Sequence, residues 1–316
     1  MQNAKLMADA SIPLPLWYRT GAWVRRRFGP RLGVLNQFPP RPLSVPDHYR
    51  QHVPLHDPPV VSIVTPSFNQ AEFLERTLQS VLGQDYQPLE FIVQDGGSRD
   101  GTGSILERYR DRLHHVESAP DGGQAQAINR GFLHAGGSIL AFLNSDDLLL
   151  PGAIHCVARY FVEHPEVDVV YGHRIVINER DEEVGRWILP PHCPQALLWN
   201  NYVPQETLFW RRRIWDMVGG LDESFRSALD WDLVLRFHRA GARFHRLPRF
   251  LGAFRIHPKQ KTETCHFDAG LPEQQRLRLA MHGRAVARPE GWLRAFPYLM
   301  KSLVYHRLYQ VGILRY

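Results

Sequence analysis

The chain has 316 residues, of which 44% are hydrophobic and 22% are charged, so it has ample material for one large domain or two small ones with a sizeable core. Its three cysteines are far apart and odd in number, which indicates neither a disulfide framework nor a cysteine zinc site and favours a reducing cytoplasm. No apolar run approaches the roughly 18 residues of a membrane-spanning helix, and the N-terminus has no signal-peptide pattern.

The net charge of +6 is concentrated at the two ends of the sequence. Residues 1–50 and residues 271–316 each carry 8 Lys/Arg and 2 Asp/Glu, which leaves the middle of the chain acidic. Both ends are also rich in aromatic residues, and basic residues interleaved with Trp and Tyr suit an anionic membrane surface. The alternative is that terminal helices pack on the core and expose solvated basic faces. An acidic middle and the lack of a base-reading module argue against nucleic acid as a partner.

In chain order, residues 1–57 are rich in proline and are expected to form an irregular extension that wraps a domain. Val60–Val64 is a β-branched run typical of a buried strand, and Pro66 is expected to end it. Asn69 is a favoured residue for capping the helix that follows, whose apolar residues recur with a period of 3.6.

Strands and helices then alternate over some 110 residues, with expected strands at Leu89–Val93, His114–Ser118, Ser138–Leu143 and Val167–Tyr171. This alternation predicts an open, mostly parallel sheet with helices on both faces. Beyond Gly172 the pattern loosens into an expected hairpin (Arg174–Asn178 and Val184–Leu189), a strand (Leu208–Arg211) and an amphipathic helix (Leu229–Ala240). The predicted division is therefore 1–57, a domain at 58–265 with halves 58–172 and 173–265, and a basic, aromatic, helical region at 266–316.

Polar residues, acids and glycines gather where the expected strands end, in Thr65–Asn69, Asp95–Ser98, Asp121–Gly123 and Asn144–Asp147. In an open α/β sheet, ligands bind at the carboxyl ends of strands, so these loops are expected to converge on one crevice. Neither a G-x-G-x-x-G fingerprint nor a phosphate loop is present, which favours a nucleotide held by carboxylates and a metal ion. The alternative for Asp146 and Asp147 is that they open a turn and cap the helix that begins near Ala153.

Three motifs, PVVSIVTPSFNQAEFLERTLQSVLGQDYQPLEFIVQDGGSRDGT, DGGQAQAINRGF and LNSDDLLLPGAI, occur in this order. Their order and spacing resemble those of a family-2 glycosyltransferase with the GT-A fold, over about residues 58–260. The resemblance implies a Rossmann-like nucleotide-binding half, a smaller acceptor half and helical terminal extensions. It also implies transfer of a sugar from a nucleoside diphosphate (UDP, GDP or dTDP) donor with inversion, using Mg²⁺ or Mn²⁺.

Carried over position by position, the resemblance implies roles for individual residues. Asn144-Ser145-Asp146 stands where the family has an Asp-X-Asp motif, so Asp146 becomes the expected metal ligand, with His257 as a second. Asp95 is expected to accept a hydrogen bond from the base or ribose, although an Asp before two glycines can also be a turn residue. The positions implied for the donor are Thr65, Pro66, Asp95, Gly96, Gly97, Asp121, Gln124, Asn129, Asn144, Ser145 and Asp147.

Leu229-Asp230-Trp231-Asp232 resembles the segment that holds the family's catalytic base, with Leu229 in place of the usual first acid. Asp230 is therefore the expected base, because an inverting transfer needs one carboxylate to take the proton of the acceptor hydroxyl. Asp232 lies about 200° further round the helix and cannot point the same way. The alternative role of Asp230 is a helix cap. Gln205–Thr207 is expected to face the acceptor, and Arg255, Lys259 and Lys261 are candidates for phosphate contact.

The expected acceptor is a saccharide or a lipid-linked saccharide in polysaccharide or lipopolysaccharide assembly, and the expected location is the cytoplasm, at the inner face of the cell membrane. Two other functions stay open. A non-catalytic sugar-nucleotide or glycan-binding module is favoured by the acids missing at Asn144 and Leu229. A nucleotidyltransferase would be expected to carry a basic, glycine-rich loop after the first strand, and Ser67–Gln70 is not one.

Overall fold

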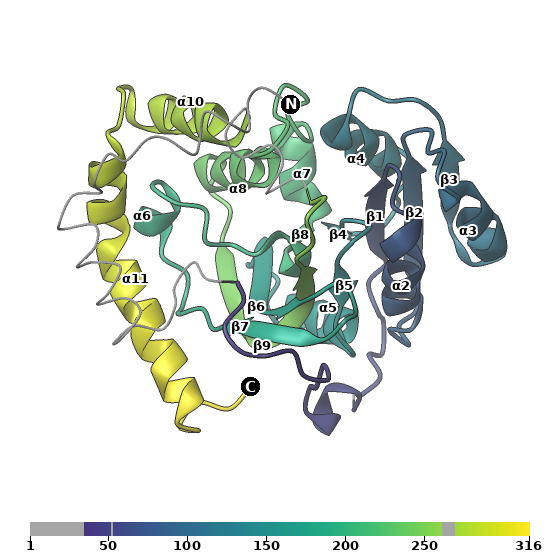
Figure 1. Cartoon of the computed structure of the whole chain (residues 1–316), viewed down its shortest axis with the longest axis horizontal. Helices are drawn as coiled ribbons and strands as arrows, with labels where there is room; N and C mark the ends of the chain where they lie inside the picture. The colour runs from purple at the N-terminus through teal and green to yellow at the C-terminus, as the bar shows by residue number, and fades with distance from the viewer. Residues whose placement is uncertain (1–34, 52, 261–268) are drawn as a thin grey trace, which may run out of the picture. The chain divides into compact units, whose positions relative to one another are not determined.

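A nine-stranded sheet organises the part of the chain that the computed structural model describes, residues 35–51, 53–260 and 269–316 (Figure 1). The strand order is β3-β2-β1-β4-β8-β6-β9-β5, with β7 beside β6. The strands are β1 (Val61–Ser67), β2 (Leu89–Asp95), β3 (His115–Ser118), β4 (Ile139–Phe142), β5 (Leu148–Leu149), β6 (Val169–Ile177), β7 (Glu183–Trp187), β8 (Phe209–Arg211) and β9 (Phe244–Arg255).

The first half of the sheet, β3-β2-β1-β4, is parallel throughout, as the strand–helix alternation predicts. Side chains along β1 alternate between two apolar cores. Val61 and Ile63 pack with α2 (Ala71–Leu82), α3 (Thr102–Tyr109) and α5 (Ala153–Glu163) on one face. Val64 packs with α4 (Gln124–Phe132) on the other face. The predicted α/β fold with helices on both faces is therefore confirmed.

Pro66 does not end the first strand, because β1 continues to Ser67. The backbone of Val64 faces β4, since its carbonyl accepts from Leu143 N at 2.9 Å, and every second residue faces the same way. The missing N–H of Pro66 therefore points to the β4 side, beyond the last β1–β4 pair at Val64 and Phe142. No ladder hydrogen bond is lost, which is why this proline is tolerated in a central strand.

The second half of the sheet is mixed. β8 runs antiparallel to β4 and β6, whereas β9 is parallel to β6 and antiparallel to β5. The two segments expected on either side of Gly172 form one strand, β6, which pairs with β7 as the expected hairpin. Gly172 approaches its neighbour closely, because a Cβ there would lie 2.6 Å from the carbonyl oxygen of Arg249 in β9. The sequence did not predict β9 as a strand.

Two short 3₁₀ helices, η1 (Asp47–Tyr49) and η2 (Arg110–Arg112), precede the acceptor half. The helices of the acceptor half and the C-terminal region are α6 (Pro194–Leu197), η3 (Gln205–Thr207), α7 (Arg212–Val218), α8 (Leu229–Arg239), α10 (Leu271–His282) and α11 (Arg288–Gln310). One face of α11 packs on the core through Ala295 and Tyr298, so the C-terminal helix does dock on the domain. Within the described residues, no helix combines the length and apolar character that crossing a bilayer requires. The predictions for residues 1–34, Cys265 and Lys261 lie outside the described residues.

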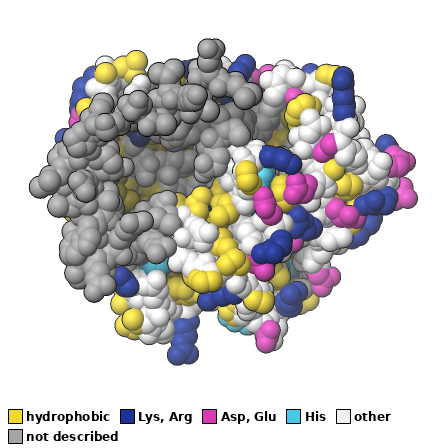
Figure 2. All heavy atoms as spheres, viewed as in Figure 1, with side chains coloured by type: hydrophobic (Ala, Val, Ile, Leu, Met, Phe, Trp, Pro, Cys, Tyr) yellow, Lys and Arg dark blue, Asp and Glu magenta, His cyan; other side chains and the backbone are white. Residues whose placement is uncertain are grey.

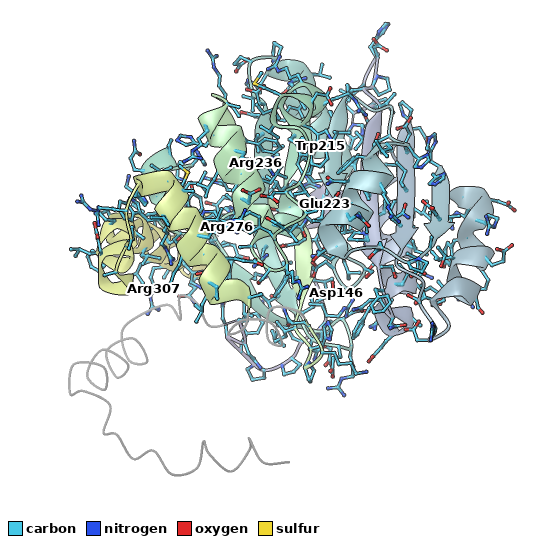
Figure 3. All side chains as sticks on the ribbon, turned by 90° about the horizontal axis from the view of Figure 1, so that it is seen from above. Asp146, Trp215, Glu223, Arg236, Arg276 and Arg307 are labelled. Carbon is cyan, nitrogen blue, oxygen red and sulfur yellow. The ribbon has the colours of Figure 1, made fainter. Side chains whose placement is uncertain are left out.

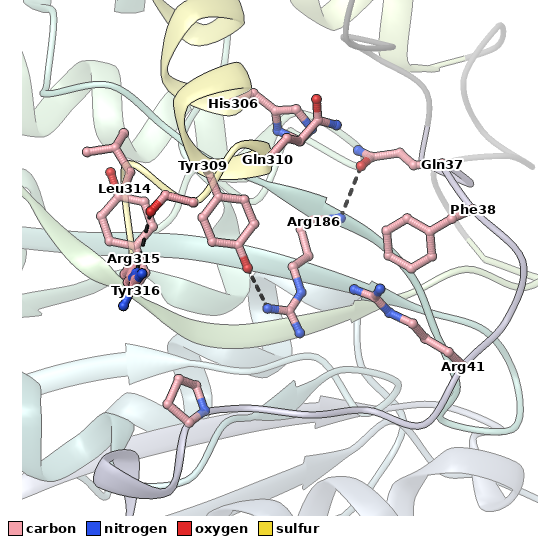
Figure 4. A pocket seen from close by; sticks show the side chains of 12 residues that line it. Gln37, Phe38, Arg41, Arg186, His306, Tyr309, Gln310, Leu314, Arg315 and Tyr316 are labelled. Carbon is pink, nitrogen blue, oxygen red and sulfur yellow. Dashed lines mark hydrogen bonds between the residues drawn. The ribbon is translucent and has the colours of Figure 1, made fainter.

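A pocket of about 530 Å³ lies between residues 37–46, β7 and the end of α11 (Figure 4). Arg186 in its wall donates to Glu183 and to the Tyr309 hydroxyl, each at 2.6 Å. Arg41 donates to the same buried Glu183 carboxylate at 2.6 Å. These cations are therefore used in holding the N-terminal segment and α11 to β7. No residue from the carboxyl ends of β1, β2 or β4 lines this pocket, so it is separate from the predicted crevice.

Candidate active site

Asp95, the last residue of β2, organises the loop that follows it. Its buried carboxylate accepts from the N–H of Ser98 at 2.9 Å, from the N–H of Gly97 at 3.2 Å and from the hydroxyl of Ser118 at 2.6 Å. Gly97 has φ +82°, a conformation that favours glycine. The turn role that the sequence left open for Asp95 is thus observed, and contact with a nucleotide stays a prediction.

An exposed aromatic ring stands beside this loop. Phe68 follows β1 directly and is 61% exposed. A Cβ added to Gly96 would lie 3.3 Å from the Phe68 ring and 2.9 Å from a carboxylate oxygen of Asp121, so the three residues meet at one place. Asn69 has φ +52° and does not cap α2; its side-chain oxygen instead accepts from Arg99 N at 2.9 Å. Phe68 is a flat apolar surface next to polar groups, which suits a planar base.

Asp146 and His257 form a close pair, although they are far apart in the sequence. The Nε2 atom of His257 lies 3.0 Å from Oδ2 of Asp146. The His257 ring is buried against Phe73, with ring centroids 4.6 Å apart. Arg255 holds the same turn by donating from Nε to the Asp146 carbonyl at 2.7 Å. A carboxylate oxygen and an imidazole nitrogen are ligands that Mn²⁺ accepts, so the two side chains fit the predicted metal site.

Asn144 stands at the centre of a polar network beside this pair. Its side-chain oxygen accepts from Gln124 Nε2 at 2.7 Å, and its nitrogen donates to Gln205 Oε1 at 3.0 Å. The buried Asp147 accepts from Arg255 N at 3.0 Å and from the Asn144 amide at 3.4 Å. Burial raises the pKa of Asp147 well above its usual range, and the neighbouring carboxylates of Asp146 and Glu206 add to that rise.

Arg174 of β6 adds a second cation to this neighbourhood, after Arg255. It makes a two-pronged ion pair with the buried Glu206, with Nε to Oε1 at 2.7 Å, and its guanidinium lies 4.4 Å from the centre of the Phe254 ring. Its positive charge lowers the pKa values of both Asp147 and Asp230, against the rise that burial causes in each.

Asp230 lies in the first turn of α8 and is partly exposed. Its carboxylate accepts from Asn201 Nδ2 and from the N–H of Trp231, at 2.9 and 2.8 Å. Burial raises the pKa of Asp230, while those two hydrogen bonds and Arg174 lower it. The residue at the N-cap position of α8 is Ala228, so Asp230 is not the cap. Asp232 instead pairs with Arg236 at 2.7 Å, in agreement with the different direction that its position in the sequence predicts.

The predicted site residues are thus joined by contacts. Gly96 meets Asp121; Gln124, in the next helix, reaches Asn144; and Asn144 reaches Asp147. Asn144 also donates to Gln205, and Asn201, earlier in the same segment as Gln205, donates to Asp230. Thr65, Pro66 and Ser145 are buried next to these loops, and the Thr65 hydroxyl has no partner.

Asn129 is one residue whose contacts point to a different role from the predicted one. Its Nδ2 atom donates to the Leu221 carbonyl and to Glu223, both at 3.0 Å, and its Oδ1 atom accepts from Leu221 N at 2.9 Å. The side chain is therefore committed to holding α4 to the segment that precedes α8. We assign it to that junction rather than to donor binding.

A cluster of His115, Glu117 and His134 has ligand atoms within 4.8 Å of one another, but it is not the predicted metal site. His115 and Glu117 lie on the edge strand β3, which two other strands separate from β4, and His134 follows α4. The two imidazole rings are stacked 3.6 Å apart with an angle of 11° between their planes. A metal ion must lie near the plane of each ring that binds it, so these parallel rings cannot share an ion unless one turns.

Sequence reasoning missed Phe68, Arg174 and Asn201. Phe68 could have been predicted, because it directly follows the end of a strand, where ligands bind in this class of sheet. Arg174 and Asn201 lie in segments without a motif, and only tertiary contacts connect them with Asp147 and Asp230.

Comparison with known proteins gives three kinds of match. The sequence profile of glycosyl transferase family 2 matches residues 62–221. Chondroitin synthase of Pasteurella multocida is 27% identical over 205 residues, which are 63% of this chain and only 21% of that protein. An uncharacterized glycosyltransferase of Mycobacterium tuberculosis, Rv1514c, is 32% identical over 184 residues, which cover 56% of this chain and 68% of that protein.

Two solved structures share the fold. Staphylococcus aureus TarS, residues 1–349 with UDP-GlcNAc, has a TM-score of 0.60 and 18% identity, covering 80% of this chain and 76% of that one. The mannosyltransferase PcManGT of Pyrobaculum calidifontis, with GDP-Man and Mn²⁺, has a TM-score of 0.54 and 19% identity, covering 94% and 82%.

Proposed function

Because this chain belongs to glycosyl transferase family 2, we propose that it moves a sugar from a nucleoside diphosphate donor to an acceptor hydroxyl, with inversion at the anomeric carbon. The observation that carries this proposal is a series of hydrogen bonds beside the Asp146–His257 pair: Asn144 donates to Gln205, and Asn201, earlier in the same segment, donates to Asp230. It sets a candidate metal site beside a candidate base. The names of similar proteins, a chondroitin synthase and a PGL/p-HBAD biosynthesis glycosyltransferase, support a role in glycan assembly.

The donor is proposed to bind along the carboxyl ends of β1, β2 and β4. Phe68 stacks on the base, and Asp121 is close enough to the same position to accept a hydrogen bond from it. The loop that Asp95 holds, with Gly96 and Gly97, forms the floor of this position. UDP-GlcNAc in TarS and GDP-Man in PcManGT make UDP- and GDP-sugars the first donors to test.

Asp146 and His257 are proposed to hold Mg²⁺ or Mn²⁺. When bound, such an ion stabilises the negative charge that develops on the departing diphosphate. Asn144 replaces a carboxylate here, so Asp146 supplies the charged oxygen ligand. Arg255 fixes that ligand through its bond to the Asp146 carbonyl.

Asp230 is proposed to take the proton of the acceptor hydroxyl as that oxygen attacks the anomeric carbon. Burial raises the pKa of Asp230, which makes its carboxylate a stronger base. Asn201 and the N–H of Trp231 fix the direction in which the carboxylate points.

Thermal melting with Mn²⁺ and a panel of UDP-, GDP- and dTDP-sugars tests donor binding, because a ligand that binds only the folded form raises the melting temperature. Hydrolysis of the donor that binds then tests catalysis. Asp230→Asn is expected to lower its rate by about 10²- to 10⁴-fold, the usual contribution of a general base. Asp232→Asn is the matched control on the same helix. Equal hydrolysis by wild type and Asp230→Asn would contradict the assignment of the base.

A non-catalytic module is the second candidate, favoured by Asn144 and Leu229, which replace acids of the family pattern. It predicts that donors raise the melting temperature but that no hydrolysis or transfer occurs with any acceptor. The same two assays therefore separate it from the enzyme.

The acceptor is proposed to be a saccharide attached to a lipid at the cytoplasmic face of the membrane. The outer face of α11 carries exposed Leu293, Phe296, Met300 and Val304 in one stripe, and residues 291–316 include no acid. An apolar stripe flanked by cations suits an anionic lipid surface. The protein is expected to float with vesicles that contain anionic lipid, and Met300→Ser/Val304→Ser is expected to reduce flotation. Equal flotation of the variant would remove this support.

A further inference from the structure

The helix that carries the proposed base begins without a cap from its own sequence. The residue at its N-cap position is Ala228, which has no side chain that could accept a hydrogen bond. The first N–H groups of a helix need acceptors, and the N–H of Trp231 has one in the side chain of Asp230. The N–H groups of residues 226–228, which lead into the helix, have an acceptor from elsewhere in the chain.

Glu273, in the first turn of α10, supplies it. Its carboxylate accepts from the N–H of Arg226 at 2.7 Å and from the N–H groups of Ser227 and Ala228, both at 2.8 Å. Three consecutive backbone donors thus share one side chain that lies 45 residues beyond Ala228. Its negative charge also stands at the positive end of the α8 dipole, which is favourable.

The rest of α10 holds the same segment. Arg276, one turn after Glu273, donates to the Ser224 hydroxyl at 2.8 Å and lies 4.3 Å from the centre of the Phe225 ring (Figure 3). At the other end of α8, Arg239 donates to the carbonyl of Ala280. The two helices therefore lie side by side, with their starts together and their ends together (Figure 1).

Asp230 follows Ala228 by two residues, so the position of its carboxylate depends on where α8 begins. We propose that Glu273 is a positioning residue for the sugar transfer: by capping the start of α8 from the C-terminal region, it fixes the Asp230 carboxylate against the acceptor. This inference rests on the proposed function of Asp230. It makes α10 part of the acceptor site. The carboxylate of Glu273 binds residues 226–228, whereas the proposed donor site is built on β1, β2 and β4.

Two variants of the full-length protein test the proposal. Glu273→Ala leaves three N–H groups without an acceptor and is expected to lower kcat for donor hydrolysis by about 10- to 100-fold, the scale of a small misplacement of a catalytic group. The KM for the donor is expected to stay unchanged. Glu273→Gln keeps one oxygen, which can accept from Ser227 and Ala228, and is expected to recover part of the lost kcat. Glu290→Ala is the matched control, because Glu290 pairs with Arg284 at 2.9 Å in the same region.

Hydrogen exchange at the amides of residues 226–228 is measured on the same proteins and does not depend on activity. Faster exchange with lower kcat, unchanged donor KM and partial recovery in Glu273→Gln supports the proposal. Faster exchange with unchanged kcat overturns it, and leaves the proposed function intact. An equal fall in kcat for Glu290→Ala also overturns it. If Glu273→Ala does not fold, Glu273→Gln takes its place: a kcat lower than that of Glu290→Ala supports the proposal, and an equal kcat overturns it. Failure of the proposed function itself would be seen separately, as unchanged hydrolysis by Asp230→Asn.

Discussion

The ion pair between Arg174 and Glu206 gives the sharpest test of the site's electrostatics. Glu206 is 2% exposed, and both side chains lie within the protein beside Asp147. Replacing Arg174 with Met leaves the Glu206 carboxylate buried without its partner, and replacing Glu206 with Met leaves the guanidinium in the same state. Removing one partner of a buried pair costs about 3–5 kcal/mol of stability. That is a large fraction of the roughly 5–15 kcal/mol by which a domain is stable.

The double variant Arg174→Met/Glu206→Met is expected to lose much less unfolding free energy than the two single variants together, because it leaves neither charge buried without its partner. A coupling free energy of about 2 kcal/mol is expected for side chains in direct contact. The recovery is expected to be incomplete, since Asp230 also loses a cation that lowers its pKa. Urea unfolding followed by tryptophan fluorescence at neutral pH measures all four proteins. If the losses of unfolding free energy in the two single variants add up to that of the double variant within about 0.5 kcal/mol, the two side chains do not act as one unit.

Three further predictions concern stability and its dependence on pH. Asp230→Asn is expected to raise the melting temperature at neutral pH, because burial raises the pKa of Asp230 above 3.8 and its ionised form therefore opposes folding; the gain is expected to grow as pH rises from about 4, and a gain that is largest in acid would contradict it. Asn129→Ala is expected to lower the unfolding free energy by about 1–3 kcal/mol, measured in urea, because the groups of Leu221 and Glu223 lose their partner. Glu183→Gln is expected to cost about 3–5 kcal/mol, since Arg41 and Arg186 both lose the buried carboxylate between them; an unchanged urea midpoint would show that the pairs contribute nothing.

The nucleotide-binding half could be predicted from the sequence because its signals are local. β-branched runs, 3.6-residue periodicity and glycines at strand ends each depend on neighbours in the chain, and the structure places β1 to β4 where those signals indicate. The extension of β1 through Pro66 was not predicted, because it depends on where β4 ends on the neighbouring side. β9 was missed for a similar reason. Its residues alternate poorly, and its pairing with β6 decides its structure.

In the candidate site, too, local motifs could be predicted from the sequence and tertiary contacts could not. The motifs identify Asp95, Asp146 and Asp230, and the pairing of Asp146 with His257 agrees with both being expected ligands. What the motifs do not contain is the set of residues that hold these acids. Arg174, Asn201 and Glu273 each act on a residue between about 27 and 56 positions away, and no spacing rule connects them. The contacts of Asn129 could not be foreseen either, since an amide in a helix carries no sign of the segment it will hold.

The two departures from the family pattern, Asn144 and Leu229, are explained by what surrounds them. The Asn144 amide donates to Asp147 and Gln205 and accepts from Gln124, which a carboxylate could not do in full because it has no donor. An Asp there would also place a further negative charge within 3.4 Å of Asp147, whose pKa burial already raises well above its usual range.

Leu229 is 4% exposed and packs in the apolar core beneath α8, where an ionised acid would need a partner. Each substitution therefore removes a charge that this particular packing could not stabilise, and each leaves the neighbouring acid, Asp146 or Asp230, in place. The surroundings of Asn144 and Leu229 therefore account for the absence of both acids, because one position needs a hydrogen-bond donor and the other an apolar side chain.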